Sequence, residues 1–324
     1  MFTSGSPAKT RILVVRLGAL GDIIHALPAA ASLKHSYPGS RLTWAVERRW
    51  APLLAGNPFV DRLVTVRRDS PRGILETIRA LREERYDFAV DLQGLIKSAV
   101  VASLARPERI FGFDQSLLRE RAAGVFYSDK ALTSSAHVVD RNLDLAAAAG
   151  ASNVLRTFPL PMGQPQGELP QGDFVLASPL AGWRSKQWPE AHYRALALRL
   201  RRELAIPLVL DGPSDAAFTE IPEALTHTSG LPGLIHATRR AAAVIGVDSG
   251  PLHLGAALGK PGIAIYGPTD PVRNGPYGES IRVLRSPSAV TSYKRGSEID
   301  DSMRQVSPDQ VFEALRAMLG CCVR

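Results

Sequence analysis

Residues 16–28, RLGALGDIIHALP, place a glycine-bracketed turn and a carboxylate directly after an apolar run. Residues 12–15 read as a buried parallel strand, and Asp22 stands where the next helix opens. In open α/β sheets, ligands bind beyond the carboxyl ends of the strands, where a helix N-terminus offers free N–H groups and a positive dipole end. Asp22 is therefore a candidate catalytic carboxylate. A cap for the helix is the competing interpretation, since aspartate is a favoured N-cap.

A similar arrangement recurs in the second half of the chain. The apolar run 243–247 is followed by Asp248, Ser249, Gly250 and a proline that suits the first position of a helix. His253 follows within the first turn of that helix. The backbone N–H groups of Ser249 and Gly250 could face a diphosphate, and a cap beside a buried histidine is the alternative.

Two further loops follow apolar runs in this half. Residues 182–189, GWRSKQWP, contain Arg184 and Lys186. A lysine is a mobile point charge that suits a diphosphate, whereas Arg184 could equally face solvent. Residues 266–271, YGPTDP, supply the hydroxyl of Thr269 and a carboxylate. Because the carboxyl ends of parallel strands meet at one edge of a sheet, these three loops predict a ligand-binding face.

The chain lacks the motifs of several common enzyme classes. It has no Gly-x-x-x-x-Gly-Lys-Ser/Thr loop and no Gly-x-Gly-x-x-Gly followed about twenty residues later by an acidic residue, which argues against NTPases and dehydrogenases. There is no convincing Ser-His-Asp or Cys-His triad, and Asp300 with Asp301 reads as a solvated loop rather than a metal site. The chemistry must therefore come from the turns described above.

Composition and charge limit the classes of protein to which the chain can belong. The 324 residues, 45% hydrophobic and 22% charged, are typical of a globular chain with two domains. No run approaches the roughly 18 apolar residues of a membrane span, and Arg16, Asp22 and His25 also interrupt the only stretch that could serve as a signal peptide. We therefore expect a cytoplasmic protein.

The net charge of +8 is unevenly spread along the chain. Residues 1–150 carry 21 Lys and Arg against 15 Asp and Glu, whereas residues 151–324 carry 18 against 16. A positive first half attracts polyanions such as an anionic lipid surface or a phosphorylated acceptor. Because no zinc-finger spacing, aromatic RNA-binding cluster or long Lys/Arg run is present, we expect no nucleic acid partner.

The elements that must position these residues alternate between strand and helix, which predicts βαβ units and mostly parallel sheets. The expected strands are residues 12–15, 41–46, 62–66, 88–92, 109–112, 174–177, 207–210, 243–247 and 262–266. The expected helices are residues 23–36, 51–54, 72–84, 96–105, 137–150, 190–204, 216–225, 231–241, 252–258 and 308–319.

Two Rossmann-like domains are expected from this alternation. Residues 156–172 are rich in Pro, Gly and Gln without periodicity, so we expect a linker there between domains 1–155 and 173–324. The last helix, 308–319, could pack on either domain.

Together these segments resemble the ADP-heptose:lipopolysaccharide heptosyltransferases of glycosyltransferase family 9. RLGALGDIIHALPA is similar to the N-terminal signature of the family, YDFAVDLQGLIKSAVVA to its fourth-strand segment, and RERAAGVFY and HVVDRN to helices of its acceptor domain. SKQWP, GVDSGPLHLGAALGKP and IYGPTDP resemble its donor-domain blocks. The resemblance runs from about residue 11 to residue 278, and the order of several blocks makes it specific.

The resemblance implies a GT-B fold, in which two Rossmann-like domains with parallel sheets face each other across a cleft. The N-terminal domain would bind the acceptor and the C-terminal domain the nucleotide sugar. It implies inverting transfer of L-glycero-D-manno-heptose from ADP-heptose to a Kdo residue of Kdo-lipid A, in synthesis of the lipopolysaccharide inner core. No metal and no cofactor would be needed. We expect a monomer that contacts the cytoplasmic face of the inner membrane peripherally.

The resemblance also implies roles for single residues. Asp22 would be the general base, and Lys186 would hold the donor diphosphate. Asp248 would contact the heptose hydroxyls. The remaining donor-binding positions would be Ser249, Gly250, His253, Gly21 and Thr269, and the acceptor-binding positions would be Lys97, Arg119 and Arg141.

Two segments depart from the pattern of the family. Residues 179–184, PLAGWR, stand where a Thr/Ser pair and acidic residues are common, and Ser302 stands where a cysteine often precedes the methionine. Two alternatives therefore stay open. One is a family 9 transferase with another acceptor or nucleotide sugar, and the other is a non-catalytic nucleotide-sugar-binding protein, which would not need Asp22.

Overall fold

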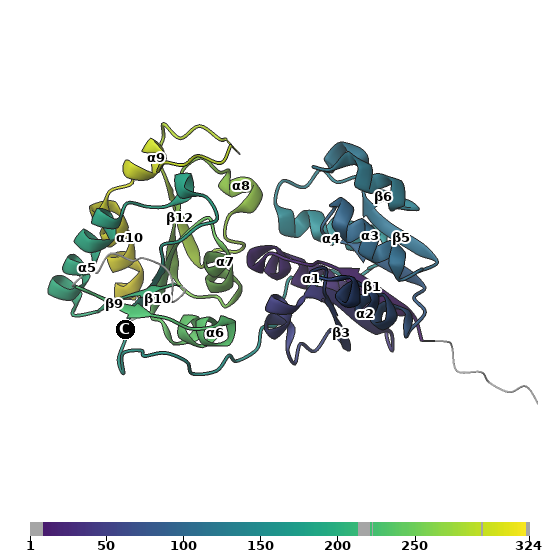
Figure 1. The fold of residues 1–324 in the computed structure, drawn as a ribbon. Helices are drawn as coiled ribbons and strands as arrows, with labels where there is room; N and C mark the ends of the chain where they lie inside the picture. Colours follow the sequence, from purple (N-terminus) through teal and green to yellow (C-terminus); the bar gives the residue numbers. More distant parts are fainter. Residues whose placement is uncertain (1–8, 213–220, 222, 293, 322–324) are drawn as a thin grey trace, which may run out of the picture. The chain divides into compact units, whose positions relative to one another are not determined.

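The computed structural model describes residues 9–212, 221, 223–292 and 294–321. The chain divides into two compact units, Met1–Pro161 and Met162–Arg324. Each unit is built around one six-stranded parallel sheet with helices packed on it (Figure 1). The α/β fold class with two Rossmann-like domains is therefore confirmed.

The sheet of the first unit has the strand order β3-β2-β1-β4-β5-β6. Its strands are β1 (Arg11–Val15), β2 (Arg41–Glu47), β3 (Arg62–Val66), β4 (Phe88–Asp91), β5 (Arg109–Phe113) and β6 (Asp129–Ala131). Its helices are α1 (Leu20–Ser36), α2 (Pro71–Arg82), α3 (Ile96–Leu104) and α4 (Val138–Ala148), with 3-10 turns η1 (Arg48–Leu54), η2 (Gln115–Leu117) and η3 (Arg121–Phe126).

The second unit repeats the same doubly wound connectivity, with the order β12-β11-β10-β7-β8-β9. Its strands are β7 (Val175–Ser178), β8 (Leu208–Asp211), β9 (Ala224–His227), β10 (Ala243–Val247), β11 (Gly262–Tyr266) and β12 (Ile281–Arg285). Its helices are α5 (Glu190–Leu204), α6 (Leu231–Arg240), α7 (Gly250–Ala257), α8 (Pro271–Asn274), α9 (Asp301–Arg304) and α10 (Pro308–Cys321), with the 3-10 turn η4 (Arg184–Lys186).

Three strands, β6, β9 and β12, were not expected from the sequence. β6 and β9 have only three and four residues, and each of the three strands lies at an edge of its sheet, where one side has no strand partner. Half-exposed strands lack the continuous apolar run that marks a central parallel strand. The expected helix 216–225 was wrong at residues 224 and 225, which belong to β9, while residues 216–220 and 222 lie outside the described part of the chain.

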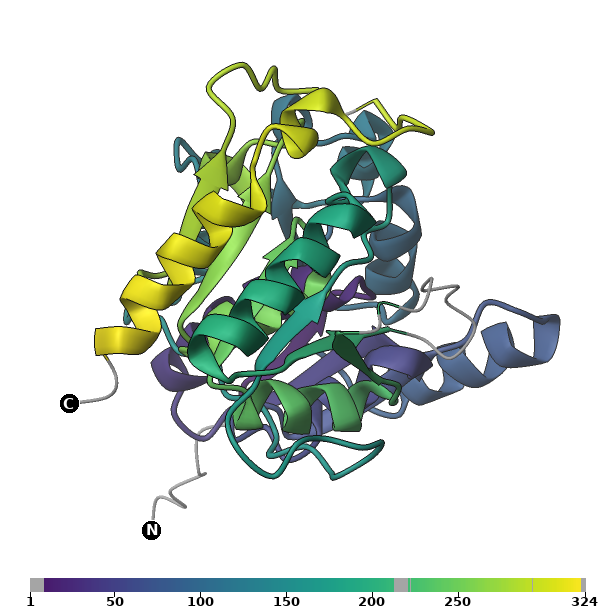
Figure 2. The same ribbon diagram turned by 90° about the vertical axis from the view of Figure 1, so that its left-hand side faces the viewer.

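The last helix, α10, packs within the second unit against α5 and β11. The side-by-side course of α5 and α10 is visible in Figure 2, where α10 is yellow. Val311, Phe312 and Leu315 of α10 are fully buried in the core of this unit. The indole Nε1 of Trp188 donates a hydrogen bond to the carbonyl of Val306 over 2.8 Å, which fixes the segment that leads into the helix.

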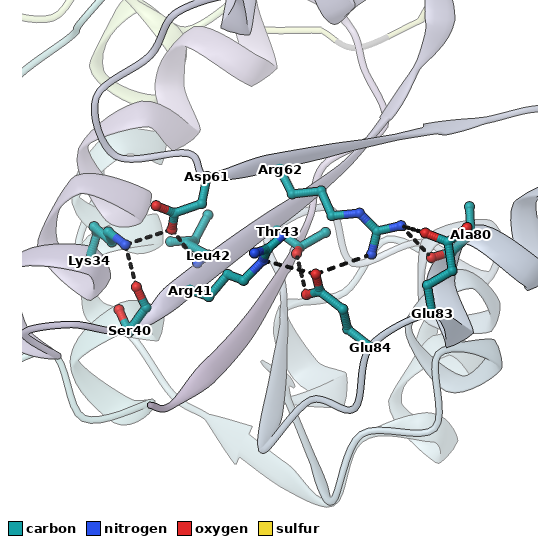
Figure 3. A network of polar contacts seen from close by, with 10 residues as sticks. All are labelled: Lys34, Ser40, Arg41, Leu42, Thr43, Asp61, Arg62, Ala80, Glu83 and Glu84. Atoms are coloured by element: carbon teal, nitrogen blue, oxygen red, sulfur yellow. Dashed lines mark hydrogen bonds and ion pairs between the residues drawn. The ribbon is translucent and has the colours of Figure 1, made fainter. Parts of the chain in front are cut away.

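A polar network lies at the amino ends of β2 and β3 (Figure 3). Glu84 accepts a hydrogen bond from Thr43 Oγ1 at 3.5 Å and forms an ion pair with Arg41 Nε at 2.8 Å. Asp61 pairs with Lys34 Nζ at 2.6 Å and accepts the N–H of Leu42 at 2.7 Å. Ligands bind at the carboxyl ends of the strands in such sheets, so we assign this network to stability.

Residues 156–172 contain no helix or strand, and part of this segment is tied to the second unit. His227, the last residue of β9, is fully buried. Its Nε2 lies 2.8 Å from the carbonyl oxygen of Gln166, and its Nδ1 lies 2.9 Å from Asp211 Oδ1. A carbonyl only accepts hydrogen bonds, so Nε2 carries a proton. The hydrogen bond with Asp211 raises the pKa of His227, although burial opposes the rise.

This contact predicts that stability depends on pH. A histidine pKa that is higher in the folded state contributes stability that is fully present below its unfolded value near 6.5 and is lost as pH rises through the folded value. We expect the unfolding free energy of the protein to fall, as pH rises above about 6.5, more steeply than that of Asp211→Asn. Denaturant titrations at several pH values measure this. Equal slopes for the two proteins would contradict the assignment, and His236→Asn is the control.

Candidate functional site

The strand orders define two topological switch points. At such a point, the connections that follow two neighbouring strands run to opposite sides of the sheet. The two switch points lie between β1 and β4 in the first unit and between β7 and β10 in the second. Ligand sites of doubly wound sheets form there, beyond the carboxyl ends of the strands. Asp22 follows β1, Lys186 follows β7 and Asp248 follows β10. Asp22, Lys186 and Asp248 therefore each lie at the switch point of their own unit.

Asp22 is the third residue of α1, and Ala19 is the N-cap. The interpretation of Asp22 as the N-cap was therefore wrong in position. Its Oδ2 reaches back to accept the N–H of Ala19 at 3.1 Å, as the acidic residue of a capping box does. Its Oδ1 forms an ion pair with Arg16 Nη2 at 2.8 Å, and the side chain of Asp22 is 47% exposed. The helix start thus holds the carboxylate while leaving about half of it accessible.

Arg16 is a residue of this site that the sequence did not identify. It directly follows β1 and is only 7% exposed. Its Nη1 donates a hydrogen bond to the carbonyl of Leu92, the first residue after β4, while its Nη2 pairs with Asp22. The only signal in the sequence was a single cation at the end of an apolar strand. The partner that explains it lies 76 residues away.

A cluster of cations surrounds Glu47 at the carboxyl end of β2. Arg68 Nη2 lies 2.6 Å from Glu47 Oε1, Arg49 Nη2 lies 3.1 Å from Oε2, and Lys97 Nζ lies 3.8 Å from Oε1. Burial would raise the pKa of Glu47, but the hydrogen bonds from Arg68 and Arg49 outweigh it and lower that pKa. Three cations against one carboxylate leave an excess of positive charge. Lys97 was expected in a site, whereas Arg49 and Arg68 were not.

The other two expected acceptor residues lie on different elements. Arg119 is exposed in the segment between η2 and η3. Its neighbour Glu120 accepts the N–H of Ile96, the first residue of α3, at 2.8 Å, so Arg119 lies near the start of the helix that carries Lys97. Arg141 lies on α4, which packs against α1, and its Nε donates to the carbonyl of Ser135 at 2.8 Å. No described contact joins Arg141 to the other two cations.

In the second unit, Lys186 and Asp248 form a largely buried ion pair. Lys186 Nζ lies 3.0 Å from Asp248 Oδ2 and 2.8 Å from the backbone carbonyl of Asp248. His253 Nε2 lies 3.7 Å from Asp248 Oδ1. Burial alone would raise the pKa of Asp248, but His253 and the charge of Lys186 together lower it to about 2. Asp248 is therefore a carboxylate at neutral pH, and it acts as a hydrogen-bond acceptor.

Among the hydroxyl groups at this edge of the sheet, those of Ser249 and Thr269 have no partner within the described residues. Ser249 is the N-cap of α7, which begins at Gly250, and Thr269 follows the neighbouring strand β11. Both hydroxyl oxygens are buried and make no hydrogen bond to the part of the chain that the structure describes. An unsatisfied buried hydroxyl costs about 1–3 kcal/mol, so a ligand with oxygen atoms in this position would be favoured.

The departing segment 179–184 and the stretch that contains Arg295 and Asp300 meet at the lysine loop. The ammonium of Lys186 lies 4.8 Å from the ring centroid of Trp183, and the guanidinium of Arg295 lies 5.7 Å from the same ring. The N–H of Asp300 donates to the carbonyl of Ser185 over 3.3 Å. The aromatic residue that replaces the family pattern therefore contacts Lys186, the residue predicted to bind the diphosphate. The sequence assigned no role to Trp183 or Arg295.

The last expected donor residue, Gly21, belongs to the first unit. It is the second residue of α1 and is buried beside Asp22. Within the described residues, no group of three or more His, Cys, Asp or Glu side chains could hold a metal ion. Across that same part of the chain, every helix is too short or too polar to cross a bilayer.

Known proteins match this chain over most of its length. The sequence model of the protein family named glycosyltransferase family 9 (heptosyltransferase) matches residues 74–300. Lipopolysaccharide heptosyltransferase 1 of Escherichia coli K12 is 30% identical over 312 residues, which cover 86% of this chain and 94% of that protein. Lipopolysaccharide heptosyltransferase 2 of Salmonella typhimurium is 28% identical over 350 residues, covering 96% and 99%. The structure of E. coli heptosyltransferase WaaC with ADP matches with a TM-score of 0.78 and 26% identity, covering 95% and 99%.

Proposed function

Because the chain belongs to glycosyltransferase family 9, we propose that it transfers L-glycero-D-manno-heptose from ADP-heptose to a Kdo residue of Kdo-lipid A. In this proposal the transfer inverts the configuration at the anomeric carbon and needs no metal ion. One observation carries the proposal. The first unit has a half-exposed carboxylate held by a buried arginine, and the second has a buried cation and carboxylate beside two unpartnered hydroxyls. A proton acceptor and a phosphate-and-sugar site are the two parts that this transfer needs.

The second unit supplies the donor site. Lys186 offers a positive charge to the diphosphate, and the N-terminus of α7 offers the backbone N–H groups of Ser249 and Gly250. Asp248 accepts hydrogen bonds from hydroxyls of the heptose. The hydroxyls of Ser249 and Thr269 gain the partners that they lack within the described chain. The similarity to a heptosyltransferase whose structure contains ADP supports a nucleotide diphosphate as this ligand.

The first unit supplies the base and the acceptor site. Asp22 takes the proton of the acceptor hydroxyl while the oxygen attacks the anomeric carbon from the face opposite to the diphosphate. The new bond joins that oxygen to the anomeric carbon, and the bond from this carbon to the phosphate oxygen breaks, so ADP leaves with the bonding electrons. Lys186 stabilises the charge that develops on the diphosphate, which removes the need for a metal.

The cations of the first unit suit an anionic acceptor. Lys97, with Arg49 and Arg68, leaves a positive excess around Glu47, and Arg119 and Arg141 add further charge. Kdo carries a carboxylate and lipid A carries phosphates, so both find positive partners. Since such an acceptor lies in a bilayer, the enzyme would act as a peripheral protein at the cytoplasmic face of the inner membrane. We further propose that it works as a monomer without a cofactor.

Mass spectrometry of the product tests this function. The full chain is offered ADP-heptose, ADP-glucose or UDP-glucose, each with Kdo-lipid A. We expect a single heptose-sized mass increment with ADP-heptose only. The similarity to heptosyltransferase 2 favours one alternative, a heptosylated acceptor that receives a second heptose, so that acceptor is tested in parallel. Donor binding without any product would instead indicate a nucleotide-sugar-binding protein.

A further inference from the structure

The turn that carries Asp22 is held by the loop that follows β4. Gln93 Oε1 accepts the N–H of Leu17 at 2.9 Å, and the carbonyl of Leu92 accepts a hydrogen bond from the guanidinium of Arg16. The carbonyl of Leu17 in turn accepts the N–H of Glu47 at 3.0 Å. Leu17 is thus held by hydrogen bonds on both sides of β1, and the β4 side does so through an amide side chain.

The β4 loop is itself organised by Asp91, the last residue of that strand, which is fully buried. Asp91 Oδ1 accepts the backbone N–H groups of Gln93 at 2.9 Å and Gly94 at 3.3 Å. Asp91 Oδ2 accepts the hydroxyls of Ser98 at 2.8 Å and Tyr127 at 2.7 Å. The carboxylate therefore receives four hydrogen bonds from three elements, and it fixes the direction in which residues 92–94 leave the sheet.

A second feature shows how closely this loop is packed. Gly94 has a φ of +68°, and a Cβ at this position would lie 2.7 Å from the side chain of Leu118. The aromatic ring of Tyr127 covers Gly112 so closely that a Cβ there would lie 2.3 Å from it. Leu118 and Tyr127 therefore pack closely on the loop and on β5, and the hydroxyl of Tyr127 reaches Asp91.

We propose that Asp91 and Gln93 are positioning residues that set the place of the Asp22 carboxylate through the β4 loop and Arg16. The chain of contacts is continuous. Asp91 fixes the loop, the loop presents the carbonyl of Leu92 and the amide of Gln93, these hold Arg16 and Leu17, and Arg16 pairs with Asp22. Part of this inference rests on the proposed function, because the consequence for catalysis requires Asp22 to be the base. The structural consequence does not.

Gln93→Leu is the principal test, because leucine has a similar size but cannot accept the N–H of Leu17. We expect kcat to fall about 10-fold or more, since a misplacement of about 1 Å can cost about 100-fold in rate. The affinity for ADP, measured by calorimetry, should not change. Asn57→Leu is the matched control. Asn57 is another amide side chain of the first unit; its Nδ2 donates to the carbonyl of Pro159 at 3.0 Å, and its loss should leave kcat unchanged.

A double-variant comparison separates positioning from general damage. In the Asp22→Asn background there is no base left to position, so Gln93→Leu should lower the residual rate by less than 2-fold. If Gln93→Leu lowers the rate by the same factor in both backgrounds, the positioning role is refuted. It is also refuted if Gln93→Leu leaves the kcat of the otherwise wild-type enzyme unchanged. An Asp22→Asn variant with full activity would refute the proposed base and not the contacts described here.

A crystal structure of Gln93→Leu gives a result that needs no activity. We expect the turn at residues 16–19 to move and the pair between Arg16 and Asp22 to open. An unchanged pair would overturn the inference whatever the enzyme transfers. Asp91→Asn provides a second variant, because an amide has one acceptor oxygen and cannot accept both the two backbone N–H groups and the two hydroxyls. It should open the same pair, and retention of the pair would again contradict the proposal.

Discussion

Replacement of Asp22 by asparagine is expected to reduce transfer by about 100-fold or more while leaving the affinity for ADP nearly intact. An amide has the size of the carboxylate and can still accept the N–H of Ala19, but it cannot take a proton from the acceptor hydroxyl. The residues that we assign to the diphosphate lie in the other unit of the chain, so donor binding should not depend on this change. Single-turnover rates and calorimetric titration with ADP measure the two quantities separately.

Asp61→Asn is the matched control for this variant. Asp61 also forms an ion pair with a cation, Lys34, and also accepts a backbone N–H, but it lies at the amino ends of the strands (Figure 3). Both variants lose one carboxylate charge in the same unit, and only Asp22→Asn should lose activity. Undiminished turnover in Asp22→Asn would remove the proposed mechanism. It would leave the nucleotide-sugar-binding function as the better interpretation.

Replacement of Lys186 by methionine is expected to weaken donor binding and to reduce transfer by about 100- to 1,000-fold, because the charge on the leaving diphosphate loses its partner. This result differs from that of Asp22→Asn, where ADP affinity is retained. Methionine keeps most of the length of the lysine stem, so the loss isolates the charge. Binding is measured by calorimetry with ADP-heptose, and turnover by release of ADP.

The same variant should also destabilise the second unit. Removing one partner of a buried ion pair costs about 3–5 kcal/mol when the other charge is left without a partner, and here His253 still lies 3.7 Å from Asp248 Oδ1, so we expect a smaller loss. The pKa of Asp248, now about 2, should then rise, since the coulombic effect of Lys186 is one of the causes that lower it.

The double variant Lys186→Met, Asp248→Asn is the control, because it removes both charges. It should regain much of the thermal stability but none of the activity. If Lys186→Met binds ADP-heptose as tightly as the wild type, the lysine serves only to neutralise Asp248, and its role in the donor site is wrong.

Much of the site could be predicted from the sequence because its signals are local. The turn before Asp22 and the segment from Asp248 to His253 each follow a strand that is buried on both faces, and such strands read as continuous apolar runs. Glycine and proline then mark the turn, and the helix follows at once. Lys186 and Thr269 occur in the same local context, which is why these loops were assigned to one edge of a sheet.

The partners of these residues could not be predicted in the same way. The sequence showed Arg16 only as a cation next to an apolar strand, and its contacts depend on β1 pairing with β4, 76 residues further along. Likewise, Arg68 reads as an ordinary surface arginine until the pairing of β2 with β3 brings it to Glu47. Pairing of distant strands decides these contacts, and periodicity within a segment carries no information about it.

The amino-acid sequence by itself therefore determined the alternation of strands and helices and the chemical groups placed at the turns. Both follow from apolar periodicity and turn chemistry within about fifteen residues. The tertiary structure alone decided the edge strands β6, β9 and β12, whose residues become strands only because a neighbouring strand offers backbone partners. It also decided that Asp91 fixes the β4 loop, which in turn holds the turn that carries Asp22. A buried carboxylate gains its role from the donors that surround it, and here three of its four donors come from the loop and helix that follow it and the fourth from Tyr127.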